Sequence, residues 1–125
     1  MNTLLDSHTL IWFLHEPERL AAEALRTLRD PARAVYFSAA SVWELELKAA
    51  RGKLTLPEGW VQSARDSGFV ELAVSASHAH ASAHLPWHHR DPFDRILVAQ
   101  ALEHGLRVAT RDPLLSEYEA PILPV

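Results

Sequence analysis

Short apolar segments alternate with helical patterns along the whole chain of 125 residues, and this alternation constrains the fold more than any other feature. Candidate strands lie at residues 3–5, 34–37, 69–74 and 106–109, with a weak fifth at residues 121–125. Short strands that alternate with helices are typical of a parallel sheet covered on both faces. We therefore expect one α/β domain over residues 1–125, with three layers and a short, mostly parallel central sheet of four to five strands.

Helix boundaries are marked by capping residues and by prolines. The best-defined helix begins after Asp91, has Pro92 at its first position and ends at Gly105. An earlier helix begins after Ser38 or Ser41 and ends at Gly52, and further helices are predicted at residues 9–15, 20–28, 57–65 and 77–85. The prolines of the last segment confine its strand to an edge of the sheet.

Composition excludes several classes of protein. The chain has no cysteine, so disulfides and thiolate metal sites are absent. No apolar run approaches the length of a membrane span, and residues 1–8 lack the pattern of a signal peptide, so we expect a cytoplasmic protein without a membrane partner. The net charge of -4 offers no overall basic surface of the kind that indicates nucleic-acid binding.

Four acidic residues fall where an open α/β sheet binds ligands, beyond the carboxyl ends of its strands. Asp6 directly follows the first strand and Asp112 follows the fourth. Glu44 lies in the first turns of the helix after the second strand, and Asp94 lies near the start of the helix before the fourth. The pattern therefore predicts four carboxylates at one edge of the sheet.

Each of these acids also has a purely structural alternative. Asp6 and Asp94 could take part in helix caps, Asp112 could form a turn, and Glu44 could pair with Lys48 one helical turn away. Together, however, four converging carboxylates repel one another unless a cation compensates for their charge. A divalent metal removes that cost, so the joint pattern favours a metal site.

Carboxylate oxygens are the ligands that suit Mg²⁺ or Mn²⁺, and such a site supports the hydrolysis of phosphodiesters without a nucleophilic side chain. The sequence agrees, because it has no serine nucleophile elbow, no cysteine and no glycine-rich phosphate loop among its 4 glycines.

At four blocks the chain resembles the PIN-domain ribonucleases, most closely the toxin subunits of VapBC-type toxin–antitoxin pairs. The blocks are residues 4–8 (LLDSH), 38–45 (SAASVWEL), 89–95 (HRDPFDR) and 110–112 (TRD), and the similarity covers essentially the full length. The resemblance implies that Asp6, Glu44 and Asp94 are the principal metal ligands, that Asp112 is the fourth acid and that Thr110 supports them. Asp91 is interpreted as a helix cap.

The resemblance also implies an activity and partners. We expect Mg²⁺- or Mn²⁺-dependent endonucleolytic cleavage of RNA, a homodimer, and neutralisation by a small antitoxin protein. Trp12, Phe13, Trp43 and Leu47 could form the antitoxin groove, although ordinary core packing is an equal alternative for each.

Basic and histidine residues surround the acidic blocks. Arg90, Arg95 and Arg111 flank the acids in sequence and are candidates for holding the RNA backbone. His80 and His84 have a spacing that can hold zinc, but no neighbouring carboxylate completes the motif. His88 and His89, just before the acidic helix, could contact RNA, with a solvated loop as the alternative.

Two alternatives to a nuclease stay open at this point. The first is a PIN-like binding module without activity, which the complete set of acids argues against. The second is another Mg²⁺-dependent phosphohydrolase or a receiver domain, but a receiver needs a late lysine and none follows Lys53. Without the four candidate acids, 12 acids balance 12 bases, so the negative surplus equals the proposed metal site. RNA binding should therefore depend on cations.

Overall fold

A computed structural model describes the whole chain, residues 1–125, and has a five-stranded parallel sheet at its centre. The strand order is β3-β2-β1-β4-β5, so the first strand occupies the middle and the proline-flanked last strand lies at an edge, as predicted. The strands are β1 (Thr3–Leu5), β2 (Val35–Ser38), β3 (Val70–Leu72), β4 (Arg107–Thr110) and β5 (Ile122–Pro124). The α/β prediction is confirmed.

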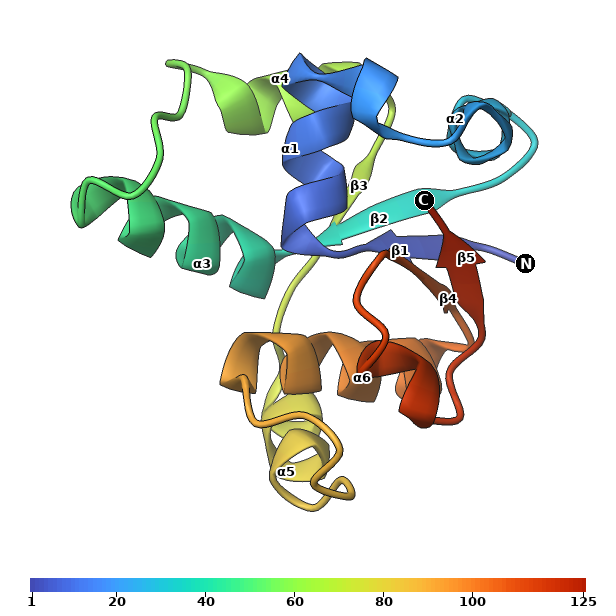
Figure 1. The fold of residues 1–125 in the computed structure, drawn as a ribbon. Helices are drawn as coiled ribbons and strands as arrows, with labels where there is room; N and C mark the ends of the chain where they lie inside the picture. Colours follow the sequence, from blue (N-terminus) through green and yellow to red (C-terminus); the bar gives the residue numbers. More distant parts are fainter.

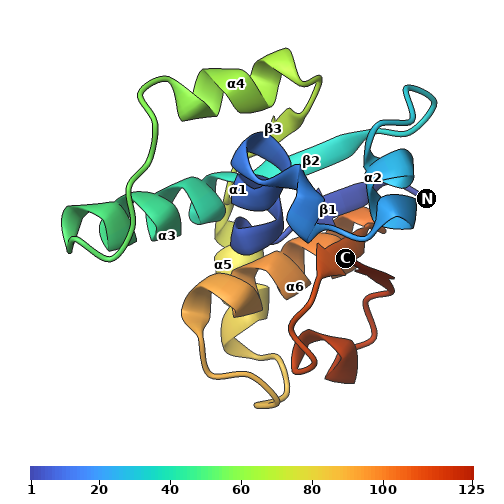
Figure 2. The same cartoon turned by 45° about the horizontal axis from the view of Figure 1, so that its top comes forward.

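Helices cover both faces of this sheet, so the domain has three layers (Figures 1 and 2). The helices α1, α2 and α4 lie on one face and α5 and α6 on the other, while α3 extends outward from the end of β2 and contacts α1 and α6. Their bounds are α1 (Ser7–His15), α2 (Ala22–Leu28), α3 (Ala39–Ala50), α4 (Trp60–Asp66), α5 (Ala76–Ala83) and α6 (Pro92–His104). Two short 3₁₀ turns, Pro17–Arg19 and Leu115–Glu117, were not predicted.

Two hydrophobic cores form because successive strand residues point to opposite faces. Leu5 packs in the core beneath α1, α2 and α4, whereas its neighbour Leu4 packs in the core beneath α6. Both leucines are fully buried. The central strand is therefore fixed from both sides, and the residue that follows it, Asp6, is held at the carboxyl edge of the sheet.

Capping residues set the starts of the helices that point at this edge. The Asp6 carboxylate accepts the Thr9 backbone N–H at 2.8 Å, which starts α1 two residues earlier than predicted. Asp91 accepts the Phe93 N–H at 2.8 Å at the start of α6, as expected for the cap. Of the two candidate caps of α3, Ser38 is the one used. None of the helices has both the length and the apolar character needed to cross a bilayer.

Candidate active site

Asp6 and Asp112 are joined at the carboxyl edge of the sheet through Thr110. Asp6 is 6% exposed, and its Oδ2 accepts the Thr110 hydroxyl at 2.5 Å. The same hydroxyl oxygen accepts the Asp112 backbone N–H at 3.0 Å. Because β1 and β4 are parallel neighbours, their ends meet here, and Thr110 fixes one oxygen of Asp6 relative to the backbone of Asp112.

His89 links Asp112 to a third carboxylate of this edge, that of Asp94. Its Nε2 lies 2.8 Å from Asp112 Oδ2 and 3.1 Å from Asp94 Oδ2. Its Nδ1 accepts the Asp91 backbone N–H at 3.1 Å, so the proton of the neutral ring sits on Nε2. His89 therefore donates a hydrogen bond to the acids rather than offering a lone pair to a metal. The side chain is buried and not part of a solvated loop.

Glu44 brings the fourth carboxylate from α3. It is 5% exposed, and its Oε2 accepts the Lys48 ammonium at 2.8 Å, which is the pair considered from the sequence. Its Oε1 is buried and has no hydrogen-bond partner. A buried carboxylate oxygen without a hydrogen-bond donor loses its hydration and lowers the stability of the fold. A bound cation would compensate for this loss, so Oε1 is a candidate ligand atom at the edge of the site.

The pKa of Asp94 is raised by its burial and by the charges of neighbouring acids. Its pKa is raised from the ordinary 3.8 to about 7, first by burial and then by the negative charges of Asp91, Glu44 and Asp6, while His89 acts in the opposite direction. The charges of Glu44 and Asp6 therefore reach Asp94, as convergence of the acids requires. In the absence of a cation the site does not hold all of its carboxylates ionised at neutral pH.

This donor set fits a hard divalent cation. The carboxylates of Asp94 and Asp112 lie with His89 within 4.8 Å of one another, Asp6 is linked to Asp112 through Thr110, and Glu44 offers an unpartnered oxygen. Oxygen ligands of this type favour Mg²⁺ or Mn²⁺ over zinc. The chemistry of the residues thus agrees with the metal expected from the sequence.

Arg95 has a structural position that differs from the predicted contact with RNA. It is 3% exposed although it neighbours Asp94 in sequence. Its guanidinium stacks over Trp87 and donates to four backbone carbonyls at 2.7 to 3.1 Å, those of Ser82, Leu85, Pro86 and His89. Arg95 therefore holds the loop between α5 and α6 in place, and its donors are used within the protein.

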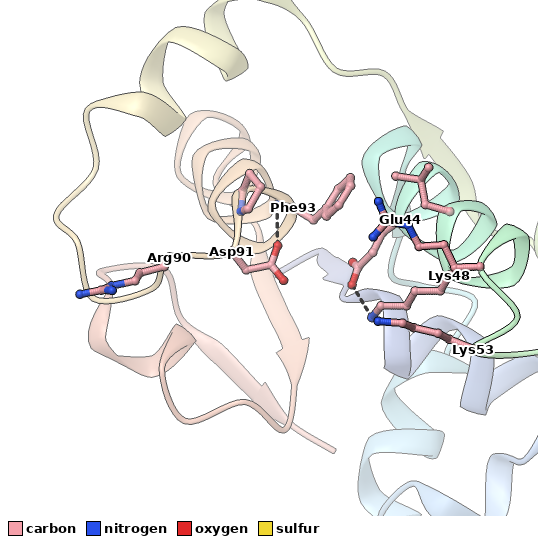
Figure 3. A pocket seen from close by; sticks show the side chains of 9 residues that line it. Glu44, Lys48, Lys53, Arg90, Asp91 and Phe93 are labelled. Atoms are coloured by element: carbon pink, nitrogen blue, oxygen red, sulfur yellow. Dashed lines mark hydrogen bonds and ion pairs between the residues drawn. The ribbon is translucent and has the colours of Figure 1, made fainter.

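The other two candidate arginines differ from each other in their surroundings. Arg111 donates to the carbonyl oxygens of Arg19 and Val125 and lies over the Trp12 ring, so it ties α1 and the final strand together. Arg90 is exposed and lines the cavity beside Glu44, but its side chain extends away from the acids (Figure 3). Only Arg90 is free to contact a substrate.

Four further histidines form two pairs, one hydrogen-bonded and one stacked. The rings of His80 and His84 stack on the surface of α5, without a carboxylate partner. His78 Nε2 lies 2.8 Å from both His104 Nε2 and Glu103 Oε2. Since its Nδ1 accepts the Ser75 N–H at 2.9 Å, His78 is a donor at Nε2, and the group joins α5 to α6 rather than presenting a ligand set.

The four apolar residues considered for a partner groove belong to different surfaces. Phe13 packs on Phe69 at 4.8 Å between ring centroids, next to the core under α4. Trp43 is 63% exposed and meets Phe93 of α6 edge-on at 5.0 Å. Leu47 lines the cavity beside Glu44. Core packing is therefore the role of Phe13, whereas Trp43 lines an apolar hollow between α3 and α6.

The fold and the acidic edge together define an α/β domain with a carboxylate cluster that could hold a hard cation, and comparison with known proteins identifies its family. Residues 3–121 match the model of the PIN domain. The chain is 33% identical over 122 residues to Ribonuclease VapC22 of Mycobacterium tuberculosis (strain ATCC 25618 / H37Rv), covering 94% of this chain and 92% of that protein. This chain therefore belongs to the PIN domain family, as a VapC-type member.

Solved structures agree on the fold. FitAcB from Neisseria gonorrhoeae superposes with a TM-score of 0.61 at 25% identity, covering 98% of this chain and 96% of that one. A toxin-antitoxin complex from Klebsiella pneumoniae superposes with a TM-score of 0.65 at 18% identity, with coverage of 98% and 97%. The second similarity concerns the fold alone.

Proposed function

We propose that this protein is an endoribonuclease that hydrolyses RNA phosphodiester bonds with Mg²⁺, or Mn²⁺ as a substitute, and acts as the toxin of a toxin–antitoxin pair. The observation that carries the proposal is the convergence of buried carboxylates at one edge of the sheet. Burial first, and then the charges of the neighbouring acids, raise the pKa of Asp94 to about 7. The name of the 33% identical relative, a ribonuclease, supports RNA as the substrate. We place this activity in the cytoplasm, the location expected from the sequence.

In this proposal Asp6, Glu44, Asp94 and Asp112 hold the metal. A bound divalent cation supplies an activated water near neutral pH and compensates for charge on the leaving oxygen. Thr110 keeps Asp6 in place through the 2.5 Å hydrogen bond. The remaining Asp6 oxygen is held by the helix cap, so the orientation of the carboxylate is set before any ligand arrives.

His89 is assigned a positioning role. Its Nε2–H contacts both Asp94 and Asp112, and its backbone N–H donates to the Tyr118 hydroxyl at 3.0 Å. This fixed donor holds two carboxylates from different elements at one point. The adjacent His88 lies on the surface against the Tyr118 ring and has no contact with the acids.

The test is cleavage of total RNA by purified protein, with mapping of the cleavage sites. We expect cleavage with Mg²⁺ or Mn²⁺, none with a chelator, and a loss of about a hundredfold or more in Asp6→Asn and Asp94→Asn, since each removes several kcal/mol of charge stabilisation. Asp66→Asn on α4 is the matched control and should cleave like wild type. Equal cleavage by Asp94→Asn, or cleavage in the chelator, would contradict the proposal.

We further propose two protein partners, an antitoxin and a second copy of this chain. The Klebsiella pneumoniae structure is described as a toxin-antitoxin complex, which supports the first. For the second, an apolar hollow of about 400 Å³ lies between α3 and α6 and includes the exposed Trp43 and Val74. An apolar surface of this kind next to a functional site is typical of a protein interface.

A further inference from the structure

A second hollow beside the acidic edge is lined by four basic residues among its nine. It lies between the end of α3 and the start of α6 and has a volume of about 440 Å³ (Figure 3). Glu44, one of the four acids, forms part of its wall, so the hollow adjoins the candidate metal site. Its charged lining consists of Lys48, Arg51, Lys53 and Arg90 against Glu44 and Asp91, a local positive excess on a chain of net charge -4.

The end of α3 is built so that two of these cations meet. Gly52 has a φ of 73°, a left-handed conformation that turns the chain back at the helix end. As a result the Lys53 backbone N–H donates to the Lys48 carbonyl oxygen at 2.9 Å, and the Gly52 N–H donates to the Ala49 carbonyl at 3.0 Å. This cap brings Lys53 back beside the last turn of α3 and next to Lys48 (Figure 3).

Two of the cations carry charge that no carboxylate of the protein neutralises. The ammonium of Lys48 pairs with Glu44, whereas Arg51 and Lys53 form no ion pair and are exposed. By comparison, Arg19 and Arg65 on other surfaces do pair with nearby glutamates. The unpaired charges of Arg51 and Lys53 are therefore available to an anion that enters the hollow.

We propose that Arg51 and Lys53 form a subsite for a backbone phosphate of the RNA strand whose adjacent linkage lies at the acids. The proposal deepens the proposed function and rests on it. A strand with one phosphodiester at the carboxylates must place a neighbouring phosphate within a nucleotide of them, and this hollow is the adjoining region that offers free positive charge. Flexible ammonium and guanidinium groups bind a phosphate without reading its base, so the subsite gives affinity and direction rather than sequence specificity.

The experiment measures the salt dependence of RNA binding in the Asp94→Asn background, where hydrolysis is prevented. The probe is a fluorescent single-stranded oligouridylate of about twelve nucleotides, a length that spans a typical single-strand site, in Mg²⁺ buffer with anisotropy as readout. Each lost phosphate contact lowers the slope of log Kd against log salt by about 0.7 for a single strand. Because the two cations together hold one phosphate, Arg51→Ala/Lys53→Ala should lower it by about 0.7 and weaken binding about fivefold at 0.1 M salt.

The matched control is Arg26→Ala/Arg29→Ala, which removes two exposed arginines at α2 that form no ion pair. We expect it to leave the slope unchanged. An unchanged slope in Arg51→Ala/Lys53→Ala would overturn the subsite, and so would a lower melting temperature with the same slope, because the two cations would then only stabilise the end of α3. Failure of the wild-type protein to cleave total RNA would instead refute the proposed function, so the two failures are distinguishable.

Discussion

Replacing Asp94 by asparagine should stabilise the metal-free protein at pH 8, although it removes a proposed metal ligand. The folded protein raises the pKa of Asp94 from 3.8 to about 7, which means that it binds this proton more tightly than the unfolded chain does. Metal-free stability therefore falls as the pH rises from about 4 to about 7. Asparagine keeps the shape of the side chain without the charge and avoids this loss.

The magnitude follows from the size of the pKa change. A rise from 3.8 to about 7, at about 1.4 kcal/mol per pH unit, corresponds to about 4 kcal/mol at pH 8. Because asparagine also gives up the ionic contact of Asp94 with His89 at 3.1 Å, we expect Asp94→Asn to gain about 2 to 4 kcal/mol. At pH 4 the two proteins should be about equally stable, since Asp94 is then protonated.

The assay is urea-induced unfolding in a chelator at pH 4 and pH 8, followed by tryptophan fluorescence. Asp66→Asn is the control, because it removes an exposed acid from α4 and should give no pH-dependent gain. Adding Mg²⁺ at pH 8 should stabilise the wild type more than Asp94→Asn. If Asp94→Asn were no more stable than wild type at pH 8, neither burial nor the neighbouring acids would disfavour the charged form of Asp94, and the physical basis of the proposed metal site would be refuted.

Two further predictions concern residues outside the acidic edge. Arg95→Ala should lower the free energy of unfolding, measured in urea, by about 3 kcal/mol or more, because four backbone carbonyls lose a charged donor. If Arg95 only contacted RNA, the substitution would instead raise KM and leave the free energy of unfolding unchanged. Trp43→Glu should convert a dimer to a monomer in light scattering, because it places a charge in the apolar hollow between α3 and α6; an unchanged mass would contradict an interface there.

The positions of the acids were predictable from the sequence because they depend on simple geometry. Parallel strands end at the same edge, so residues that follow β1 and β4 meet there whatever the details of packing. Alternation along β1 likewise assigns Leu4 and Leu5 to opposite cores. The fold class and the placement of Asp6 and Asp112 both follow from these two rules.

The roles of Arg95 and His89 depend on loop geometry that no local pattern encodes. Arg95 follows Asp94 in sequence, but successive helical residues point about 100° apart, so its side chain reaches a different surface from that of its neighbour. It meets carbonyls of residues 82–89, and His89 meets Tyr118, which lies 29 residues further along the chain. Its position next to Asp94 in the sequence was therefore misleading for Arg95. The tautomer of His89 could be assigned only from the structure, where its Nδ1 accepts the Asp91 N–H.

The charges that make up the net charge of -4 are unevenly distributed over the protein. The four candidate carboxylates lie at the sheet edge, where Lys48 is the one side-chain cation paired with them by a lysine or arginine ion pair. Burial there, together with the neighbouring acids, raises the pKa of Asp94. Such an edge repels a phosphate until a cation compensates for it. The unpaired cations Arg51 and Lys53 adjoin that edge and attract a phosphate whether or not a cation is bound. In these proposals, an overall acidic chain binds the metal ion with its carboxylates and the RNA strand with a separate set of basic side chains.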